Sequence, residues 1–327
     1  MHPLCGHALC MAAHFGLEEG VCVRNGKAES YRVNIKRYPW LYAIAFPVVL
    51  FYVVYCYLPM YGVIIAFQNY SPARGILGSK WVGLKHFISF FTGRYFFRLV
   101  SNTLLINVKL LMFGFPLPII FAILLNEIHS SGFRRITQTI TYMPHFVSSV
   151  VVCGLLKDFT KSGGLLTSIA MAFGGENVNL LSKAKLFQPL FVGMNIWQQF
   201  GWDSIIFFAA MSSIDPVLYE ATRVDGANRF QQVLHVTLPG LFPTIVVILI
   251  LRIGRLMSLG WEQIVLLYSP LVYETSDVIS TYVYRRGLLE FEYSFGTAVG
   301  LFNSLINIIL LISANALSRM VNETSLW

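Results

Sequence analysis

The strongest constraint on this chain is a set of long stretches that contain no charged side chain. Three of them lie between Arg37 and Arg74, between Arg135 and Lys157, and between Glu292 and Arg319. A helix needs about 20 apolar residues to cross the roughly 30 Å hydrocarbon core of a bilayer, because it rises about 1.5 Å per residue. These stretches are rich in Val, Ile, Leu and Phe, and they predict three membrane-spanning helices.

Three further stretches have spanning length but carry internal charge. They cover residues 99–126 with Lys109, 187–214 with Asp203, and 241–261 with Arg252 and Arg255. Only 12% of the 327 residues are charged, whereas roughly a quarter are charged in soluble domains. We therefore predict an all-α membrane protein with six transmembrane helices.

The predicted spans divide the chain into four parts. These are a cytoplasmic N-terminal segment (1–38), the first transmembrane helix with an external loop (39–98), a core of five transmembrane helices (99–319) and a cytoplasmic tail (320–327). Basic residues precede the first span at Arg24, Lys27, Arg32, Lys36 and Arg37. Because Lys and Arg concentrate on the cytoplasmic side, we expect the N-terminus there, and six spans return the C-terminus to the same side. The basic residues of the later loops favour neither side.

The connections on the predicted outer side are residues 70–98, 158–186 and 262–292. Connections of this length are too long for simple turns and commonly fold into small structures. We expect them to form docking structures for an external partner.

The N-terminal segment contains Cys5, His7, Cys10 and His14, which are residue types that ligate metal ions. No hydrophobic sequence surrounds them to build a preformed site, so a segment without bound metal is the preferred interpretation. The five cysteines are odd in number, which indicates no disulfide framework. The net charge of +8 suits anionic lipid or an acidic substrate, but no basic run alternates with aromatic residues as nucleic-acid binding would require.

One connection, residues 215–240, is unusually polar for a link between two spans. Asp215 is suited to cap a helix that begins at Pro216, because its side-chain oxygen can accept a free backbone N–H. Gly226 permits a sharp turn, and Pro239 is expected to end a second helix. The sequence thus predicts a rigid helix–turn–helix lever at the cytoplasmic surface.

This loop resembles the cytoplasmic EAA motif of type I ABC importer permeases, Glu-Ala-Ala-x3-Gly-x9-Ile-x-Leu-Pro. The matching residues are Glu220, Ala221, Gly226, Leu238 and Pro239, and the departures are Thr222 and Val236. Segments 58–70, 75–87 and 142–155 resemble the polysaccharide-type branch, and the likeness covers residues 36–319. Within that branch the chain is similar to the first permease subunit of bacterial alginate importers.

The resemblance implies a type I ABC importer permease fold that forms half of a pore in the bacterial cytoplasmic (inner) membrane. It also implies ATP-driven import of oligosaccharides, extended by the alginate likeness to anionic ones. The implied partners are a second permease subunit, a dimer of ATP-binding subunits that hold ATP and magnesium, a periplasmic or lipid-anchored solute-binding protein, and membrane lipid. The residues implied in ATPase coupling are Tyr219, Glu220, Ala221, Thr222, Asp225, Gly226, Ala227, Leu238 and Pro239.

No motif for covalent chemistry appears in the chain. The pair Gly26-Lys27 lacks both the earlier glycine and the following Ser or Thr of a phosphate-binding loop. We therefore expect no enzyme activity and no cofactor bound by this chain. His145, beside Pro144, either relays protons or bonds a carbonyl that the proline leaves free, and the second interpretation is preferred.

Asn195, Gln199 and Trp202 follow the helical spacing i, i+4, i+7, which places two amides and an indole on one face. Amides bond sugar hydroxyls and an indole packs on a sugar ring, which indicates a substrate pathway. Amides also hold helices together in membranes, so both interpretations stay open. Asn303 and Asn307 pose the same question, with helix packing preferred.

Lys109 and Arg252 are expected about 15 Å deep in the membrane, with Arg255 on the same face as Arg252. Charges at that depth cost at least about 2.5 kcal/mol each, so they need partners. The nearby spans offer only the carboxylate of Asp203. The remaining cations either pair with the second permease or attract an anionic sugar such as a uronate oligomer.

Two other functions remain open at this stage. An ion-coupled secondary sugar transporter is one, although no internal repeat is apparent. A non-transporting membrane scaffold is the other, for which the polar loop at 215–240 would have no use.

Overall fold

The computed structural model describes residues 39–322, and helices dominate them. The sheet formed by the described residues is one antiparallel pair, β1 (Gln68–Asn69) with β2 (Lys80–Trp81), in which Gln68 lies opposite Trp81. The predicted all-α class is confirmed. The N-terminal segment with Cys5, His7, Cys10 and His14 lies outside the described residues, as does residue 323 onward of the predicted tail.

The chain divides into two units, the first ending at Pro59 and the second beginning at Met60. In the first unit, α2 (Pro39–Phe51) continues into a π-helical stretch, η1 (Tyr52–Tyr57), and the 3-10 helix η2 (Leu58–Phe67) follows across the division. The described side chains of α2 and η1 are apolar and exposed. A helix with apolar side chains on all faces requires lipid or another protein around it.

Within residues 39–322, four helical segments are long and apolar enough to cross a membrane. They are Tyr42–Phe67, Phe96–Glu127, Arg229–Ile253 and Tyr293–Met320. Two bent helix pairs, Ser131–Phe146 with Ser149–Ala172 and Ala184–Met211 with Pro216–Val224, raise the number to six if each pair is one span. The prediction of six spans agrees with the structure on that counting.

The third predicted span is not one straight helix. The helix α7 (Ser131–Tyr142) ends in the 3-10 turn η3 (Met143–Phe146), and α8 (Ser149–Thr160) starts after a bend of 95°. Pro144 lacks the N–H that would continue α7, and Ser148 caps α8 by accepting a hydrogen bond from the Val150 backbone N–H. An uncharged stretch long enough to cross the membrane is therefore not always one straight helix.

The fifth predicted span has other limits than the sequence indicated. The helices α12 (Arg229–Gln232), η5 (Val233–Thr237, π-helical) and α13 (Leu238–Ile253) form one continuous segment, so Pro239 does not end a helix. The wider π turn before Pro239 accommodates its missing N–H. The helix then ends at Ile253, which places Arg252 at its C-terminal end and Arg255 beyond it.

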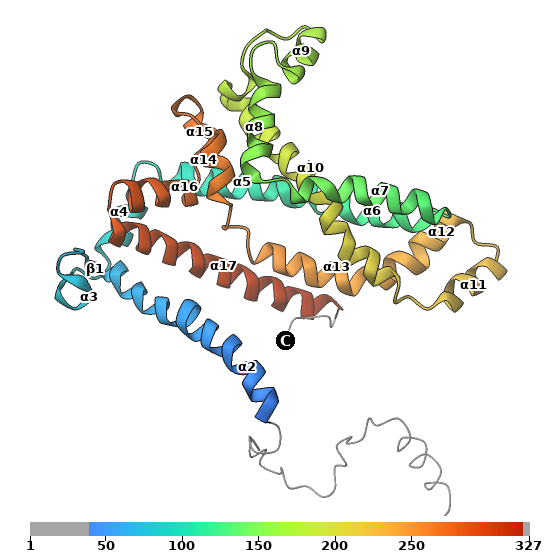
Figure 1. Ribbon diagram of the computed structural model, residues 1–327, viewed down its shortest axis with the longest axis horizontal. Helices are drawn as coiled ribbons and strands as arrows, with labels where there is room; N and C mark the ends of the chain where they lie inside the picture. Colours follow the sequence, from blue (N-terminus) through green and yellow to red (C-terminus); the bar gives the residue numbers. More distant parts are fainter. Residues whose placement is uncertain (1–38, 323–327) are drawn as a thin grey trace, which may run out of the picture. The chain divides into compact units, whose positions relative to one another are not determined.

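The second unit is organised around α10 (Ala184–Met211), which packs against α5 (Phe96–Gly114), α6 (Pro116–Glu127), α7 and α13. In Figure 1, α13 also runs beside α17 (Tyr293–Asn322). Buried apolar clusters fill the contacts, one around Phe187 and Phe191, one around Phe90 and Phe295, and one around Phe115 and Phe207. These contacts hold α5, α10 and α13 in fixed register.

The predicted outer loops contain short folded elements. These are α3 (Gly75–Gly78), α4 (Lys85–Phe91), α9 (Leu165–Ala172), η4 (Leu180–Ser182), α14 (Trp261–Leu267), η6 (Pro270–Val272), α15 (Tyr273–Ser276), α16 (Ile279–Val283) and η7 (Tyr284–Leu289). The stretch 262–292 is largely packed on the bundle rather than free, because Ile264, Val272 and Ile279 are buried.

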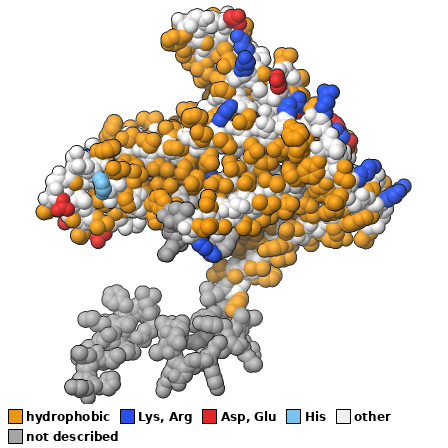
Figure 2. All heavy atoms as spheres, turned by 180° about the vertical axis from the view of Figure 1, so that it is seen from behind, with side chains coloured by type: hydrophobic (Ala, Val, Ile, Leu, Met, Phe, Trp, Pro, Cys, Tyr) orange, Lys and Arg blue, Asp and Glu red, His pale blue; other side chains and the backbone are white. Residues whose placement is uncertain are grey.

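The surface of the second unit matches a protein surrounded by lipid. Figure 2 shows hydrophobic side chains over the broad middle of the visible face, with charged side chains toward its margins. Exposed large apolar residues include Leu105, Met112, Ile120, Ile140, Leu305 and Ile312. Surfaces this apolar are stable in hydrocarbon and not in water.

Candidate translocation and coupling sites

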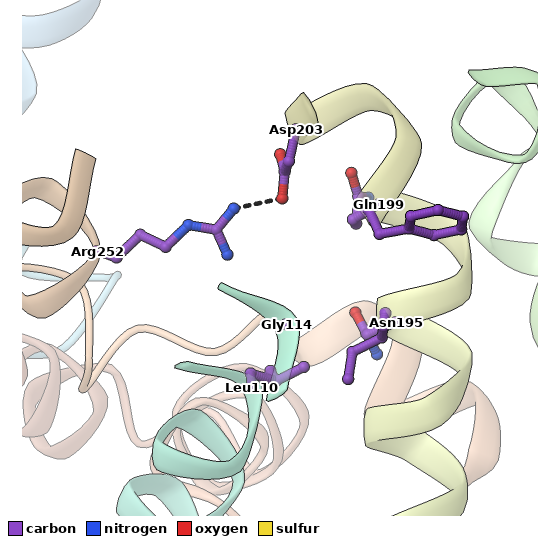
Figure 3. Close-up of a pocket in the computed structure, with 8 residues that line it drawn as sticks. Leu110, Gly114, Asn195, Gln199, Asp203 and Arg252 are labelled. Carbon is purple, nitrogen blue, oxygen red and sulfur yellow. Dashed lines mark hydrogen bonds and ion pairs between the residues drawn. The ribbon is translucent and has the colours of Figure 1, made fainter. Parts of the chain in front are cut away.

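A cavity of about 290 Å³ opens between α5, α10 and α13. Its lining residues are Leu110, Gly114, Asn195, Ile196, Gln199, Phe200, Asp203 and Arg252. Figure 3 shows Asn195, Gln199 and Asp203 along α10, facing Arg252 from the opposite wall. Asn195 and Gln199 were predicted as pathway residues from their spacing, and the structure brings both into this cavity.

The two amides each retain an unused group. Asn195 donates through Nδ2 to the Phe191 carbonyl (3.0 Å), and Gln199 shares Oε1 with His145 Nδ1 (2.9 Å). The structure gives no partner among the described residues to Asn195 Oδ1 or Gln199 Nε2. The cavity therefore presents one free amide acceptor and one free amide donor, a combination that suits sugar hydroxyls.

Arg252 is not an unpaired cation. Its Nη2 forms an ion pair with Asp203 Oδ2, and its guanidinium lies 5.9 Å from the centroid of the Phe115 ring. Its position at the end of α13 is also favourable, since the C-terminal end of a helix carries partial negative charge. The cavity wall formed by Arg252 and Asp203 is neutral overall.

Trp202 lies outside the cavity, although the spacing placed it on the face of Asn195 and Gln199. Its ring stacks on His145, with centroids 4.3 Å apart and planes inclined by 3°. Successive helical residues are separated by about 100°, so Gln199 and Asp203 lie about 40° and 80° around the helix from Asn195, whereas Trp202 lies about 20° in the opposite direction. Asp203 thus joins the cavity row in place of Trp202. His145 bonds the Gln199 amide, not a backbone carbonyl as preferred from the sequence.

Lys109 and Arg255 also lie outside the cavity. Lys109 donates through Nζ to Gln188 Oε1 at 2.6 Å, and Gln188 is buried against α5. Arg255 is exposed, and its side chain makes no polar contact with the part of the chain that the structure describes. The prediction that Asp203 leaves two cations unpaired by carboxylates agrees with these contacts, and the two are Lys109 and Arg255.

The two asparagines of α17 differ. Asn307 accepts from the Met257 backbone N–H (3.0 Å) and donates to Ser258 Oγ (2.8 Å), which supports the predicted role in packing. Asn303 Oδ1 is buried without a partner among the described residues.

The polar loop 215–240 folds as a helical hairpin. Asp215 caps α11 (Pro216–Val224) by accepting from the Val217 backbone N–H at 2.9 Å, and Gly226 has φ +79°. Asn228 then caps α12 in a reciprocal arrangement with Gln231. The predicted cap and glycine turn are confirmed.

The hairpin is fixed to the bundle at two points. Tyr219 shares a hydrogen bond of 3.0 Å with the buried Thr237, and Arg229 contacts Glu127 and His129 at the end of α6, each at 3.0 Å. Its outer surface is open. Glu220, Ala221, Asp225 and Pro239 are exposed, Thr222 and Leu238 are half-buried, and the apolar side chains of Val217, Leu218 and Val224 face outward.

A shallow cavity of about 270 Å³ lies on the hairpin. Its lining residues are Thr222, Asp225, Gly226, Ala227, Gln231 and His235. An exposed helix with apolar side chains beside a small hollow is typical of a protein contact surface.

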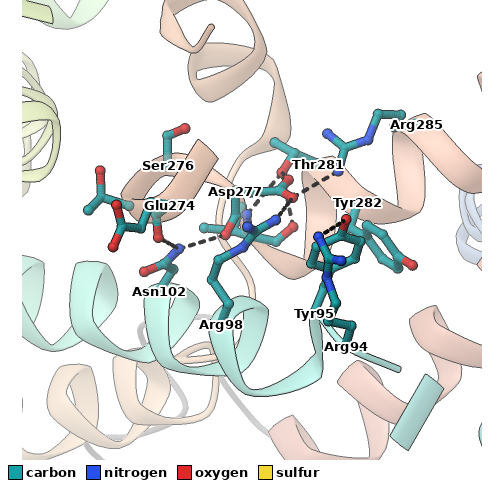
Figure 4. Close-up of polar contacts among 12 residues, drawn as sticks. Arg94, Tyr95, Arg98, Asn102, Glu274, Ser276, Asp277, Thr281, Tyr282 and Arg285 are labelled. Atoms are coloured by element: carbon teal, nitrogen blue, oxygen red, sulfur yellow. Dashed lines mark hydrogen bonds and ion pairs between the residues drawn. The ribbon is translucent and has the colours of Figure 1, made fainter. Parts of the chain in front are cut away.

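Sequence reasoning missed a buried charge cluster around Asp277 (Figure 4). The Asp277 side chain is 0% exposed, and its Oδ2 pairs with Arg98 Nη2 (3.3 Å) and Arg285 Nη2 (2.8 Å). Thr281 donates to its Oδ1 at 3.0 Å, and Asn102 donates to its backbone oxygen at 3.0 Å. The cluster joins α5 to α15, α16 and η7.

Charge and burial oppose each other at Arg285. Burial lowers its pKa, but the hydrogen bond to Asp277 and the charge of that carboxylate raise it more, so the pKa lies above its ordinary value. The guanidinium also lies 4.9 Å from the Tyr273 ring centroid. These contacts fix α5 to the segment from α15 to η7, which indicates a structural role for the cluster.

Comparisons with known proteins agree with this architecture. A sequence profile for the binding-protein-dependent transport system inner membrane component matches residues 114–323. Protein LplB of Bacillus subtilis (strain 168) is 42% identical over 303 residues, covering 92% of this chain and 95% of LplB. The polygalacturonan/rhamnogalacturonan transport system permease protein YteP of the same organism is 40% identical over 310 residues, covering 94% and 97%.

A solved structure matches the fold as well. A chain in the crystal structure of a bacterial ABC transporter involved in the import of the acidic polysaccharide alginate has a TM-score of 0.81 and 40% identity. The match covers 88% of this chain and 98% of that one. A second structure shows an alginate ABC transporter in complex with an alginate pentasaccharide-bound periplasmic protein, again with a TM-score of 0.81.

The fold and the helical hairpin define a membrane permease. The chain belongs to the family of binding-protein-dependent transport system inner membrane components. It is a multi-pass inner membrane protein and a sugar-type ABC transporter permease, and its relatives are not enzymes themselves.

Proposed function

We propose that this chain is a pore-forming permease subunit of an ATP-driven importer of acidic oligosaccharides. The observation that carries the proposal is the polar cavity on α10, where free amide groups and Arg252 face the same space. Amides suit sugar hydroxyls, and a guanidinium suits the carboxylate of a uronate. The names of a polygalacturonan permease and an alginate transporter among the similar proteins support the same substrate class.

The partners in this proposal are separate chains. A second permease completes the pore, a pair of ATP-binding subunits holds ATP and magnesium, and a periplasmic or lipid-anchored solute-binding protein delivers the sugar. Both termini lie in the cytoplasm in this arrangement, with α11 on the same side. Membrane lipid covers the apolar surface.

The hairpin is the proposed contact with the ATP-binding subunits. Tyr219 to Ala227 form the contact in this proposal, and Leu238 and Pro239 connect it to the span that carries Arg252. Movement of the hairpin is thereby transmitted along α13 to the cavity.

Replacement of Glu220 by Ala tests the coupling assignment. Glu220 is exposed, so Glu220→Ala is expected to leave membrane insertion intact while loosening ATPase association and lowering sugar-stimulated ATP hydrolysis. The matched control is Glu262→Ala, which truncates another exposed carboxylate, on α14. Equal ATPase association and hydrolysis in both variants would contradict the assignment.

A further inference from the structure

The carboxylate of the Arg252–Asp203 pair is partly exposed, unlike the fully buried carboxylate of Asp277. The Arg252 side chain is 33% exposed and that of Asp203 is 25% exposed, and both line the cavity beside Asn195 and Gln199. The two oppositely charged groups come from α13 and α10, so the ion pair spans the cavity from one helix to the other. An ion pair exposed to this degree contributes little to stability and can exchange partners.

The contact between the two side chains is a single one. It joins Arg252 Nη2 to Asp203 Oδ2, whereas a guanidinium can bind a free carboxylate through two parallel hydrogen bonds. A carboxylate that arrives from the cavity could therefore form a better contact with Arg252 than Asp203 does. The Arg252–Asp203 pair is therefore balanced in charge but uses only one of the two hydrogen bonds that a guanidinium can form with a carboxylate.

We propose that Asp203 occupies the position on Arg252 that a uronate carboxylate of the substrate takes during transport. The inference rests on the proposed function and adds the residue that sets its charge specificity. In the substrate-bound state, Arg252 binds the uronate through its guanidinium, and Asp203 is released into the hydrated cavity. Asn195 Oδ1 and Gln199 Nε2 then meet the hydroxyls of the sugar.

This arrangement discriminates by charge. A neutral sugar offers no replacement for Asp203, so the ion pair stays closed and part of the cavity remains occupied. The carboxylate of an anionic sugar replaces that of Asp203 on Arg252, and the guanidinium then forms two hydrogen bonds instead of one. Specificity is then the difference between these two outcomes, as it is in sites that combine attraction with exclusion.

The test uses the importer complex purified without its solute-binding protein, so that binding to the membrane subunits is measured directly. The probes are trigalacturonate and its fully methyl-esterified form, which has the same ring structure and no charge. Asp203→Asn removes the competing carboxylate at nearly equal volume and is expected to tighten trigalacturonate binding about tenfold. Arg252→Gln is expected to weaken it by about the same factor. Binding of the methyl ester should change little in either variant.

A charge swap separates this role from a structural one. The double variant Asp203→Arg with Arg252→Asp retains an ion pair but exchanges its ends, so it is expected to lose trigalacturonate binding while the complex stays monodisperse. Recovery of wild-type binding in the swap, or equal weakening of both probes by Asp203→Asn, would overturn the inference alone. If the wild-type complex with its binding protein transports neither probe, the proposed function falls and this inference falls with it.

Discussion

Asp277 and Asp203 both form ion pairs with arginine, but their surroundings differ. Asp277 is fully buried and bonds Arg98, Arg285 and Thr281, so both carboxylate oxygens are occupied. Within residues 39–322 the Asp203 side chain pairs with Arg252 alone, and it is 25% exposed at the edge of a cavity. Removing one member of a buried pair strands an uncompensated charge, whereas an exposed pair costs little to separate. The same two residue types therefore serve structure in one place and are available to a ligand in the other.

The largest expected effect is at the buried cluster. Asp277→Asn leaves two guanidinium groups, Arg98 and Arg285, without a counter-charge beside a fully buried amide. Both arginines keep partial exposure, so the expected loss is about 2 to 3 kcal/mol, below that of a wholly buried pair. The melting temperature and the yield of monodisperse protein measure this loss. Glu274→Gln is the control, because that carboxylate is exposed and only its backbone oxygen is hydrogen-bonded, to Asn102. A melting temperature for Asp277→Asn equal to that of the control would remove the contrast between the two aspartates.

Packing near the cavity is the next test. A Cβ on Gly201 would lie 2.1 Å from the Thr141 carbonyl oxygen, so Gly201→Val must push α10 away from α7. The expected loss is about 1 to 3 kcal/mol, with the positions of Gln199 and Asp203 disturbed. Gly193→Val on the same helix is the control, because Gly193 is exposed and a Cβ there meets nothing within 4 Å. Uronate binding that survives Gly201→Val at full strength would show that packing does not set the cavity.

Substitutions in the hairpin should change ATP-coupled uptake without affecting Asp203 or Asp277. Gly226 has φ +79°, and a β-branched residue there costs about 1 to 2 kcal/mol locally. Gly226→Val is expected to abolish ATP-coupled uptake while uronate binding persists, and Gly226→Asn to retain part of the uptake because Asn tolerates this conformation. Uptake rates for the two variants, compared at equal amounts of assembled complex, check the order.

The smallest effect on stability is expected at the open pair. Arg252→Gln should change the free energy of unfolding by about 0 to 1 kcal/mol, because the side chains are partly exposed. Thermal unfolding of the purified complex measures it beside Asp277→Asn. If Arg252→Gln destabilises as strongly as Asp277→Asn, the two clusters are alike and the pair is structural.

Much of the fold followed from local sequence. Three uncharged stretches and three apolar stretches with internal charge predicted the six spans. Asp215, Pro216 and Gly226 predicted the hairpin, since caps and positive φ are properties of single residues. The family motif in the hairpin identified the class of protein. The bend after Pro144 was missed because the span was predicted from the length of an apolar stretch, and the composition of a stretch does not indicate whether its helix is straight.

The sites were harder to predict for a different reason. Arg98 and Asp277 are 179 positions apart, and only the packing of α5 against α15 and α16 brings them together. Helical spacing found Asn195 and Gln199 but chose Trp202 over Asp203, because the direction from which α13 approaches α10 is not encoded locally. The i, i+4, i+8 row of α10 was the available signal for Asp203.

The most direct test of the account is uptake into proteoliposomes that contain the complete importer. With the binding protein and trigalacturonate outside, the account predicts uptake that requires ATP hydrolysis by the partner subunits and that falls sharply for the methyl ester. Uptake driven by a proton or sodium gradient in the absence of the ATP-binding subunits would contradict it.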